Sequence, residues 1–270
     1  MSGHETSEVA ADATRLNGLH AVVTGGGRGI GAAIALELAR RGACVSILGR
    51  HLVKVEQEVE RVHCTAGSDV SGFTCDVTDE ESVTEAFAGA RSRFGSIAIL
   101  VNNAGQAESA ALQDTSLDLW EQLIAVNLTG AFLCCREAIR DMLEQGDGRI
   151  VNVASTSALK GYGRLTAYTA AKHGLLGLTR SLAAEVARSG TTVNAVCPGY
   201  TDTGMAAAAV DNLVTAGRNA EEAKALIAKS NPRGTLIEPE EIATVVAWLC
   251  SPAARSVSGQ AIVVAGGDVR

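Results

Sequence analysis

Thr24-Gly25-Gly26-Gly27-Arg28-Gly29-Ile30-Gly31 is the stretch that decides the fold, because it joins an apolar run at 20–24 to a segment of helical spacing at 30–41. Glycines here let the backbone turn tightly and approach a pyrophosphate, whose charge the N-terminus of the following helix then stabilises. A glycine cluster alone could be only a flexible turn. A strand before it and a helix directly after it are the context that the dinucleotide-binding fingerprint requires. The stretch therefore predicts a dinucleotide-binding loop between a first strand and a first helix.

The same alternation of short apolar runs and longer helical segments continues along the chain. Short buried strands that alternate with helices indicate βαβ units, and hence an α/β fold built on a parallel sheet. The expected strands are 20–24, 44–48, 72–75, 97–101, 149–154, 191–197 and 260–265, and the expected helices include 30–41, 83–94, 120–142 and 240–250. No repeat or linker interrupts this pattern, so we expect one domain over residues 16–270, preceded by a loosely ordered tail over residues 1–15.

Composition narrows the class of protein. The formal net charge is −7 and no block of like charges stands out, which argues against nucleic acid or an anionic membrane as the main partner. No apolar run approaches the ~20 residues needed to cross a bilayer, and the first 15 residues are too polar for a secretory signal. The 7 cysteines are scattered without a C-x-x-C pair, which is typical of buried thiols in a reducing compartment. We therefore expect a cytoplasmic protein with no metal site.

The end of the second strand bears on the choice of cofactor. NAD-binding folds of this kind place an acid there, roughly 20 residues past the glycines, to hold the ribose hydroxyls. Here the strand ends in Leu48-Gly49-Arg50-His51, and Arg28 of the glycine loop would face the same ribose. Two guanidinium groups suit a 2′-phosphate and gain little from a bare hydroxyl. This favours NADP(H) over NAD(H), although both arginines could instead be solvated surface residues.

Polar and small residues follow the next two strands. Asp76-Val77 comes after the third strand, where the carboxylate could accept a hydrogen bond from an adenine amino group, and Asn102-Asn103-Ala104-Gly105 ends the fourth. Ligands of such sheets bind in the crevice at the carboxyl ends of the strands. Asn127 lies within an apolar helical segment, where an asparagine by itself is typical of a cap or a kink.

Tyr168 and Lys172 lie four residues apart, and so on one face of a helix. A phenol titrates near ~10 in water, and an ammonium group within reach lowers that pKa. The pair could then exchange a proton with a substrate oxygen near neutral pH. The spacing alone is equally typical of a half-buried ring and a solvated amine. Its context is Ser155, at the end of the fifth strand, and the Pro198-Gly199 turn that ends the sixth.

These residues, in this order and at these spacings, resemble the short-chain dehydrogenase/reductase family from about Leu19 to Gly267. The closing motif Gly259…Gly266-Gly267 fits the same family, although Ala265 stands where many members have an acid. The resemblance implies a doubly wound (Rossmann) α/β fold, with seven parallel strands in a three-layer α/β/α arrangement. It also implies an oligomer, most often a homotetramer and otherwise a dimer.

The resemblance further implies a role for each residue of the site. Tyr168 would be the general acid in reduction and the base in oxidation, and Lys172 would lower its pKa and bind the nicotinamide ribose. Ser155 would donate a hydrogen bond to the substrate oxygen, and Asn127 would hold a water that links Lys172 to solvent. The residues expected to bind the cofactor are Gly25, Arg28, Gly29, Ile30, Gly31, Arg50, Asp76, Val77, Asn103, Ala104, Gly105, Tyr168, Lys172, Pro198, Gly199, Thr201 and Thr203, of which the last two would meet the carboxamide.

In this family the segment after the sixth strand, here 204–236, would form a lid over a small carbonyl or alcohol substrate. Segments 106–111 and 160–165 should complete the pocket, with Ser157 in its lining. Lys160, Arg164 and Arg233 could meet the phosphate of an acyl-thioester carrier, or could simply be solvated.

We expect an NADP(H)-dependent oxidoreductase that interconverts a ketone and a secondary alcohol, either a 3-oxoacyl thioester or a cyclic or aromatic ketone. One alternative is an NAD-dependent secondary alcohol or 3-hydroxyacyl dehydrogenase. Another is a non-catalytic dinucleotide sensor, which should have lost one of Ser155, Tyr168 or Lys172.

Overall fold

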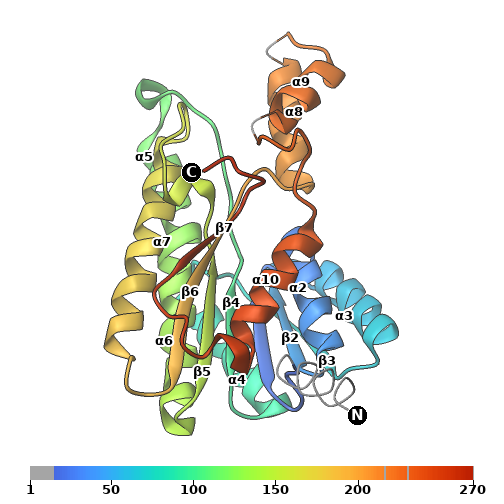
Figure 1. Ribbon diagram of the computed structural model, residues 1–270, viewed down its shortest axis with the longest axis vertical. Coiled ribbons are helices and arrows are strands. Elements are labelled where there is room, and N and C mark those ends of the chain that lie inside the picture. The colour runs from blue at the N-terminus through green and yellow to red at the C-terminus, as the bar shows by residue number, and fades with distance from the viewer. Residues whose placement is uncertain (1–14, 216, 230, 270) are drawn as a thin grey trace, which may run out of the picture.

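A seven-stranded parallel sheet in the order β3-β2-β1-β4-β5-β6-β7 forms the centre of the computed structural model, which describes residues 15–215, 217–229 and 231–269 (Figure 1). The strand order reverses between β1 and β4, and such a switch point is where doubly wound sheets open a crevice for ligands. The strands are β1 His20–Thr24, β2 Cys44–Gly49, β3 Val70–Thr74, β4 Ile99–Asn102, β5 Gly148–Val153, β6 Thr191–Pro198 and β7 Ala261–Val264. The predicted tail over residues 1–15 lies, apart from Arg15, outside the described residues.

Helices cover both faces of the sheet, which explains why its strands are apolar on both sides. They are α2 Gly29–Arg40, α3 Leu52–Ala66, α4 Glu80–Phe94, α5 Leu117–Ile124, α6 Gly130–Gln145, α7 Thr166–Glu185, α8 Gly204–Thr215, α9 Ala220–Ala228 and α10 Pro239–Cys250. Val23 and Val45 belong to one buried cluster with α2, α3 and α10, whereas Val22 and Leu48 belong to another with α4 and α6. Neighbouring residues of a strand point to opposite faces, so the two clusters are the two sides of one three-layer fold.

The predicted strands agree with the observed ones to within two residues at each end. The helix predicted over 120–142 is confirmed as one helical stretch, Leu117–Gln145, although not all of its turns are α-helical. The structure divides this stretch into α5, a π-helical segment Ala125–Thr129 and α6. Ser116 begins α5 by accepting a hydrogen bond from Leu119 N, which is the usual arrangement at a helix N-terminus. Apolar spacing places the helix correctly but does not distinguish an α-turn from the wider π-turn.

The stretch Leu117–Gln145 is long and apolar enough to span a membrane by length and composition alone, with a mean hydropathy of 1.2. Half of its most apolar window is buried within the fold. Leu123, Leu133 and Met142 point into that interior, and the last two belong to the core cluster between α6 and the sheet. We therefore assign the stretch as a core helix.

The glycine loop after β1 is held against the loop after β4. Gly25 and Gly29 have positive φ angles of 62° and 56°, which a side chain would strain. The side-chain amide of Asn103 donates hydrogen bonds to the carbonyl oxygens of Thr24 and Gly25, at 3.0 and 3.1 Å. A Cβ atom on Gly31 would lie only 2.4 Å from Asn103 Nδ2 and from Gly25 O. The first turn of α2 can therefore pack on the loop only because residue 31 is a glycine.

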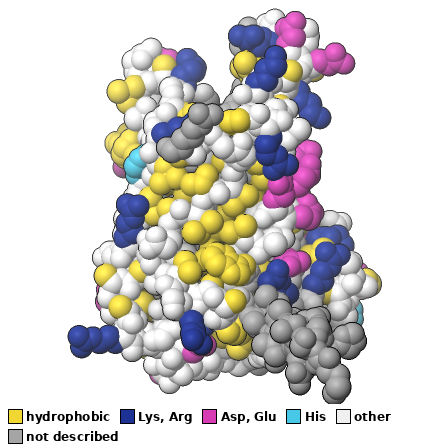
Figure 2. Space-filling view, in the orientation of Figure 1, with side chains coloured by type: hydrophobic (Ala, Val, Ile, Leu, Met, Phe, Trp, Pro, Cys, Tyr) yellow, Lys and Arg dark blue, Asp and Glu magenta, His cyan; other side chains and the backbone are white. Residues whose placement is uncertain are grey.

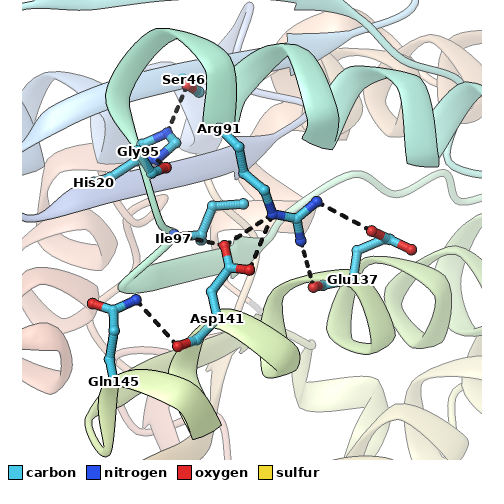
Figure 3. A network of polar contacts seen from close by, with 8 residues as sticks. All are labelled: His20, Ser46, Arg91, Gly95, Ile97, Glu137, Asp141 and Gln145. Atoms are coloured by element: carbon cyan, nitrogen blue, oxygen red, sulfur yellow. Dashed lines mark hydrogen bonds and ion pairs between the residues drawn. The ribbon is translucent and has the colours of Figure 1, made fainter.

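At the opposite, amino end of the strands, Arg91 of α4 links two carboxylates of α6 (Figure 3). Its Nε donates to both carboxylate oxygens of Asp141 at 3.1 and 3.0 Å, and its Nη1 lies 3.3 Å from Glu137 Oε2. Asp141 also accepts a hydrogen bond from the backbone of Ile97, just before β4, at 2.8 Å. The network ties two helices of one layer to the start of a central strand.

Candidate active site

A cavity of about 680 Å³ opens at the carboxyl ends of the strands, and residues of α8 line one side of it. All but one of the residues predicted for the site line this cavity. They are Gly25, Arg28, Gly29, Ile30, Arg50, Asp76, Val77, Asn103, Ala104, Gly105, Asn127, Ser155, Tyr168, Lys172, Pro198, Gly199, Thr201 and Thr203. The exception is Gly31, which lies beneath the glycine loop and shapes it.

The end of the cavity near β1 and β2 is rich in cations. Arg28 and Arg50 line it as predicted, and they are joined by His51 and Lys54, which the sequence analysis did not single out. Lys54 lies in the first turn of α3, four residues past Arg50, so a basic residue one turn beyond the strand was the available signal. Four basic side chains at one end of a cavity suit a phosphate-bearing ligand.

The start of α2 is suited to a pyrophosphate. Its N-cap residue, Arg28, makes no side-chain hydrogen bond to the first turn, and that turn carries no acidic residue. Its backbone N–H groups and the positive end of the helix dipole therefore face the cavity without a side-chain acceptor, as an anion site requires. Together with the close packing at Gly25 and Gly31, this arrangement fits a dinucleotide.

Asp76 follows β3 and lines the same cavity. One of its carboxylate oxygens accepts hydrogen bonds from Thr78 N at 3.0 Å and from Thr78 Oγ1 at 2.7 Å. Burial acts to raise the pKa of Asp76, but these hydrogen bonds and the nearby Arg50 guanidinium outweigh it, so the pKa is lowered. The carboxylate is thus ionised and oriented at neutral pH.

Tyr168 and Lys172 lie one turn apart near the start of α7, and both are buried. The Lys172 ammonium lies 5.7 Å from the centroid of the Tyr168 ring and donates a hydrogen bond to Val153 O, at the end of β5, at 2.9 Å. Ser155 lies just beyond that strand as the N-cap of a short 3₁₀-helix, Thr156–Ala158. Its Oγ accepts a hydrogen bond from the backbone N–H of Ser157 at 3.1 Å. The end of β5 thus brings the three residues to one point of the cavity.

Burial is the main cause of the pKa shifts of both Tyr168 and Lys172. Burial raises the pKa of Tyr168 to about 12, and only a hydrogen bond with Ser155 opposes the rise. Burial lowers the pKa of Lys172 to about 8. Desolvation by burial is the largest influence on the pKa of the phenol in the folded chain, and the prediction that Lys172 lowers this pKa stays a prediction.

Asn127 lies in the π-helical segment and faces the same point. Its side-chain amide donates to the carbonyl oxygens of Leu123 and Gln106, at 2.9 and 2.8 Å, and its Oδ1 accepts from Gln106 N at 3.3 Å. A Cβ atom on Gly105 would lie 2.9 Å from Asn127 Oδ1 and 3.6 Å from Lys172 Nζ. The residue therefore has the structural role that it suggests in isolation. The predicted water relay to Lys172 stays a prediction.

The other end of the cavity is lined by the segments predicted to contact the substrate. Helix α8 contributes a mainly apolar set, and Gln106–Ser109, Thr156, Ser157, Tyr162, Leu165 and Tyr200 complete the lining. The α8 residues are Gly204, Met205, Ala206, Ala208, Ala209 and Asn212. The predicted lid over 204–236 is built of α8, α9 and the turns that follow them.

The three cations considered for a carrier phosphate have different surroundings. Lys160 is paired with Asp268 at 2.7 Å, and Arg233 with Glu241 at 2.6 Å, so neither is simply solvated. Arg164 is exposed and has a φ angle of 65°, and its carbonyl oxygen accepts a hydrogen bond from Ala110 N at 2.9 Å. None of the three side chains lines the cavity.

The fold and the cavity together define an oxidoreductase of the doubly wound α/β class. The sequence model described as enoyl-(acyl carrier protein) reductase matches residues 25–268. The cis-4-hydroxycyclohexanecarboxylate dehydrogenase of Sinomonas cyclohexanicum is 42% identical over 248 residues, which cover 92% of this chain and 95% of that protein. A 3-oxoacyl-(acyl-carrier-protein) reductase of Aquifex aeolicus is 38% identical over 253 residues, which cover 94% of this chain and 98% of that protein.

Among solved structures, a variant of the actinorhodin polyketide ketoreductase determined with NADPH superposes with a TM-score of 0.88 at 36% identity. The match covers 92% of this chain and 96% of that one. The chain belongs to the short-chain dehydrogenase/reductase family. The prediction of the family, the fold and an enzyme that acts on hydroxyl and keto groups is confirmed.

Proposed function

We propose that this protein is a cytoplasmic, NADP(H)-dependent enzyme that reduces a ketone to a secondary alcohol and catalyses the reverse reaction. The observation that carries the proposal is the convergence of Ser155, Tyr168 and Lys172 at the end of β5, in one cavity with the cations near β2. A non-catalytic sensor would have no need to keep all three of these residues together.

The cations favour a 2′-phosphorylated cofactor. Arg28, Arg50 and Lys54 line one end of the cavity, and Gly49 ends β2 where an NAD-binding member would offer a carboxylate. The ketoreductase solved with NADPH supports the same choice. Bound NADPH would supply the hydride, whereas the chain supplies orientation and the proton.

The hydrogen bonds of the site support the proposed roles of the three side chains. Ser155 Oγ accepts from Ser157 N, so its own proton is available to the substrate oxygen. Tyr168, with a pKa of about 12, is protonated at neutral pH, which is the form that reduction needs for proton delivery. Lys172 commits one of its three donors to Val153 O and keeps two for the ribose hydroxyls. Negative charge that develops on the carbonyl oxygen is thus met by two hydroxyl groups in a buried site.

The substrate end favours a ketone with an apolar body, either a cyclic or aromatic ketone or a 3-oxoacyl thioester. Met205, Leu165 and the alanines of α8 offer a lining without fixed charge. The names of the similar proteins include a cyclic skeleton, that of a hydroxycyclohexanecarboxylate, and a 3-oxoacyl carrier protein. The carboxylate of the first has no matching cation among the described residues that line the substrate end of this chain.

We also propose that the enzyme is a homo-oligomer, a tetramer or a dimer. Among the described residues, no strand pairs with the outer edge of β7, the last strand of the sheet, and Val263 on it is 38% exposed. Trp248 of α10 is 36% exposed, and Figure 2 shows hydrophobic side chains gathered across the middle of this face. Trp120 and Phe132 are similarly exposed on α5 and α6. Exposed apolar surface next to an open sheet edge is typical of a contact between subunits.

A panel of neutral cyclic ketones and 3-oxoacyl thioesters, followed by oxidation of NADPH or NADH, tests the proposal. We expect kcat/KM to be at least about tenfold higher with NADPH than with NADH, because two or more guanidinium contacts are lost with the second cofactor. Tyr168→Phe should abolish turnover while NADPH still binds. Unchanged turnover in that variant would contradict the assigned chemistry, and a preference for NADH would contradict the assigned cofactor.

A further inference from the structure

The last stretch of the chain holds one wall of the substrate end. Lys160 Nζ donates a hydrogen bond to Asp268 Oδ1 at 2.7 Å and another to the backbone oxygen of Asp268 at 3.0 Å. Tyr162 donates its hydroxyl proton to Asp268 Oδ2 at 2.8 Å. The Asp268 side chain is only 9% exposed, so water screens these contacts poorly. We call Asp268, Lys160 and Tyr162 the C-terminal clasp.

The clasp fixes what Tyr162 can offer to a ligand. A phenol has one proton, and Tyr162 gives it to Asp268, so the hydroxyl of Thr156, 2.8 Å away, must be the donor to the phenol oxygen. Tyr162 lines the cavity, yet it has no proton left for a substrate. Its contribution to the wall is therefore the apolar ring. Thr156 directly follows Ser155, so the clasp also steadies the segment that carries the proposed proton donor.

The clasp also makes the Lys160 ammonium unavailable to a substrate. Lys160 donates two hydrogen bonds to Asp268, and its ammonium lies 4.9 Å from the centroid of the Tyr162 ring. Within the described part of the chain, the lysines and arginines that line the cavity are Arg28, Arg50, Lys54 and Lys172, which belong to the cofactor end and the reacting centre. Glu108 is the charged residue in the lining contributed by segment 106–109. An anionic substrate body would thus meet no available cation there.

The position of Asp268 is set by the two glycines before it. Gly266 and Gly267 have φ angles of 58° and 92°, and Asp268 N donates a hydrogen bond to Ala265 O at 3.1 Å, which turns the chain back toward Lys160. A Cβ atom on Gly266 would lie 2.8 Å from Oδ1 of Asn231, a buried residue in the segment that leaves the lid. The carboxylate is therefore placed by packing against the exit of the lid.

We propose that Asp268 is a positioning residue that selects uncharged ketones, by holding the Lys160 ammonium and the Tyr162 proton away from the substrate. This inference rests on the proposed function, because it concerns the substrate of the same site. Removing the carboxylate charge releases Lys160, and a released ammonium beside the pocket attracts a substrate carboxylate.

The test compares two ketones that share a skeleton and differ in charge, 4-oxocyclohexanecarboxylate and its methyl ester. For the unmodified enzyme we expect kcat/KM to favour the ester by about tenfold or more, since an unpaired buried carboxylate binds poorly. Asp268→Asn should reduce this ratio by about tenfold, mainly through a lower KM for the acid. Adding Lys160→Met to that variant should restore the preference for the ester. The dissociation constant of NADPH should stay within about twofold throughout.

Glu37→Gln provides a matched control, because it removes a 2.8 Å ion pair with Arg41 within α2, away from the cavity. It should leave the ratio of the two ketones unchanged. An unchanged ratio in Asp268→Asn would overturn the proposal. An equal loss of activity toward both ketones in that variant, accompanied by a lower melting temperature, would show a merely structural role and overturn it as well.

Hydrogen exchange separates failure of the clasp from failure of the proposed function. Asp268→Asn should accelerate amide exchange in residues 156–165 whether or not either ketone is turned over, because the loop loses its anchor. Unchanged exchange there would contradict the clasp. An unmodified enzyme that turns over no ketone with either cofactor would contradict the proposed function, and the exchange result would still decide on the clasp.

Discussion

His20 is a buried titratable residue that the proposed chemistry does not use. Its Nδ1 lies 2.8 Å from Gly95 O and therefore carries the proton, since a carbonyl only accepts, and its Nε2 then accepts from Ser46 Oγ at 2.9 Å (Figure 3). Burial lowers the pKa of His20. The Gly95 carbonyl and Asp141 act to raise it, and Arg91 contributes to the lowering. The neutral ring is thus the form built into the fold.

This shift predicts a loss of stability in acid. Because the pKa of His20 is lower in the folded chain than its ordinary value of 6.5, the unfolded chain binds the proton first as the pH falls. The group has no effect on the free energy of unfolding above about pH 6.5, and below it reduces that free energy by up to about 1.4 kcal/mol per pH unit. Urea unfolding at a series of pH values measures this slope.

His20→Gln should flatten the slope by up to one proton, and His173→Gln, at an exposed position on α7, is the comparison variant. The second variant thus controls for the loss of any histidine. Identical slopes for the unmodified protein and His20→Gln would contradict the prediction.

The sequence predicted the position of a residue where a local motif surrounds it. It did not predict contacts between residues that are far apart in the chain. Arg28 and Arg50 follow directly from the glycine loop and the end of a strand. The pairing of Lys160 with Asp268 joins residues 108 positions apart, and no local pattern indicates it. For a related reason the sequence does not give the pKa of Tyr168, because burial dominates it and burial is a property of the assembled fold.

At the scale of the elements, the sequence predicted the strands well because each is an apolar run bounded by turn residues. It missed the π-helical segment Ala125–Thr129, whose apolar residues keep helical spacing. The extra residue of a π-turn lets Asn127 reach Gln106 while it still bonds Leu123 O. A π-turn within an α-helix is frequently found at functional sites, and here it turns a polar side chain toward the proposed centre.

The close packing of α2 on the glycine loop predicts that a methyl group added at residue 31 weakens NADPH binding. Helix propensity alone favours alanine over glycine by about 1 kcal/mol. In Gly31→Ala, however, the new Cβ would lie 2.4 Å from the backbone oxygen of Gly25, so the loop or α2 must shift and disturb the proposed pyrophosphate site. We expect the dissociation constant of NADPH, measured by fluorescence titration, to rise by at least about tenfold.

Gly177→Ala is the matched control, since Gly177 lies within α7 and a Cβ there meets nothing within 4 Å. It should leave NADPH affinity unchanged and raise the free energy of unfolding by about 0.5–1 kcal/mol. If both variants bind NADPH like the unmodified protein, the tight join at Gly31 has no functional consequence.

In the whole molecule, the candidate active site and the ion pairs that join the helices lie at opposite ends of the strands. The cavity lies at the carboxyl ends, and the network of Arg91, Glu137 and Asp141 lies at the amino ends, where α4 and α6 meet β4 (Figure 3). The order of the strands and their parallel direction were predictable, because alternating strands and helices allow few other arrangements. The network of Arg91, Glu137 and Asp141 was not predictable, because charged residues on helices are normally expected on the solvent-exposed face.

This separation predicts that the network can be damaged without loss of activity. Arg91 is 28% exposed, and its two partners are 8% and 12% exposed, so Arg91→Met would leave two desolvated carboxylates side by side. We expect the free energy of unfolding to fall by about 3 kcal/mol, the usual cost of removing one partner from a buried ion pair. The values of kcat/KM and of NADPH affinity, measured well below the melting temperature, should stay unchanged because the cavity is at the other end of the strands.

Arg136→Met is the control variant, because it breaks another ion pair between α4 and α6 whose partner, Glu80, is 67% exposed. Its free energy of unfolding should fall by less than about 1 kcal/mol. Equal losses of stability in the two variants would contradict an anchoring role for Arg91, and a loss of turnover in Arg91→Met alone would show that the two ends of the sheet are coupled.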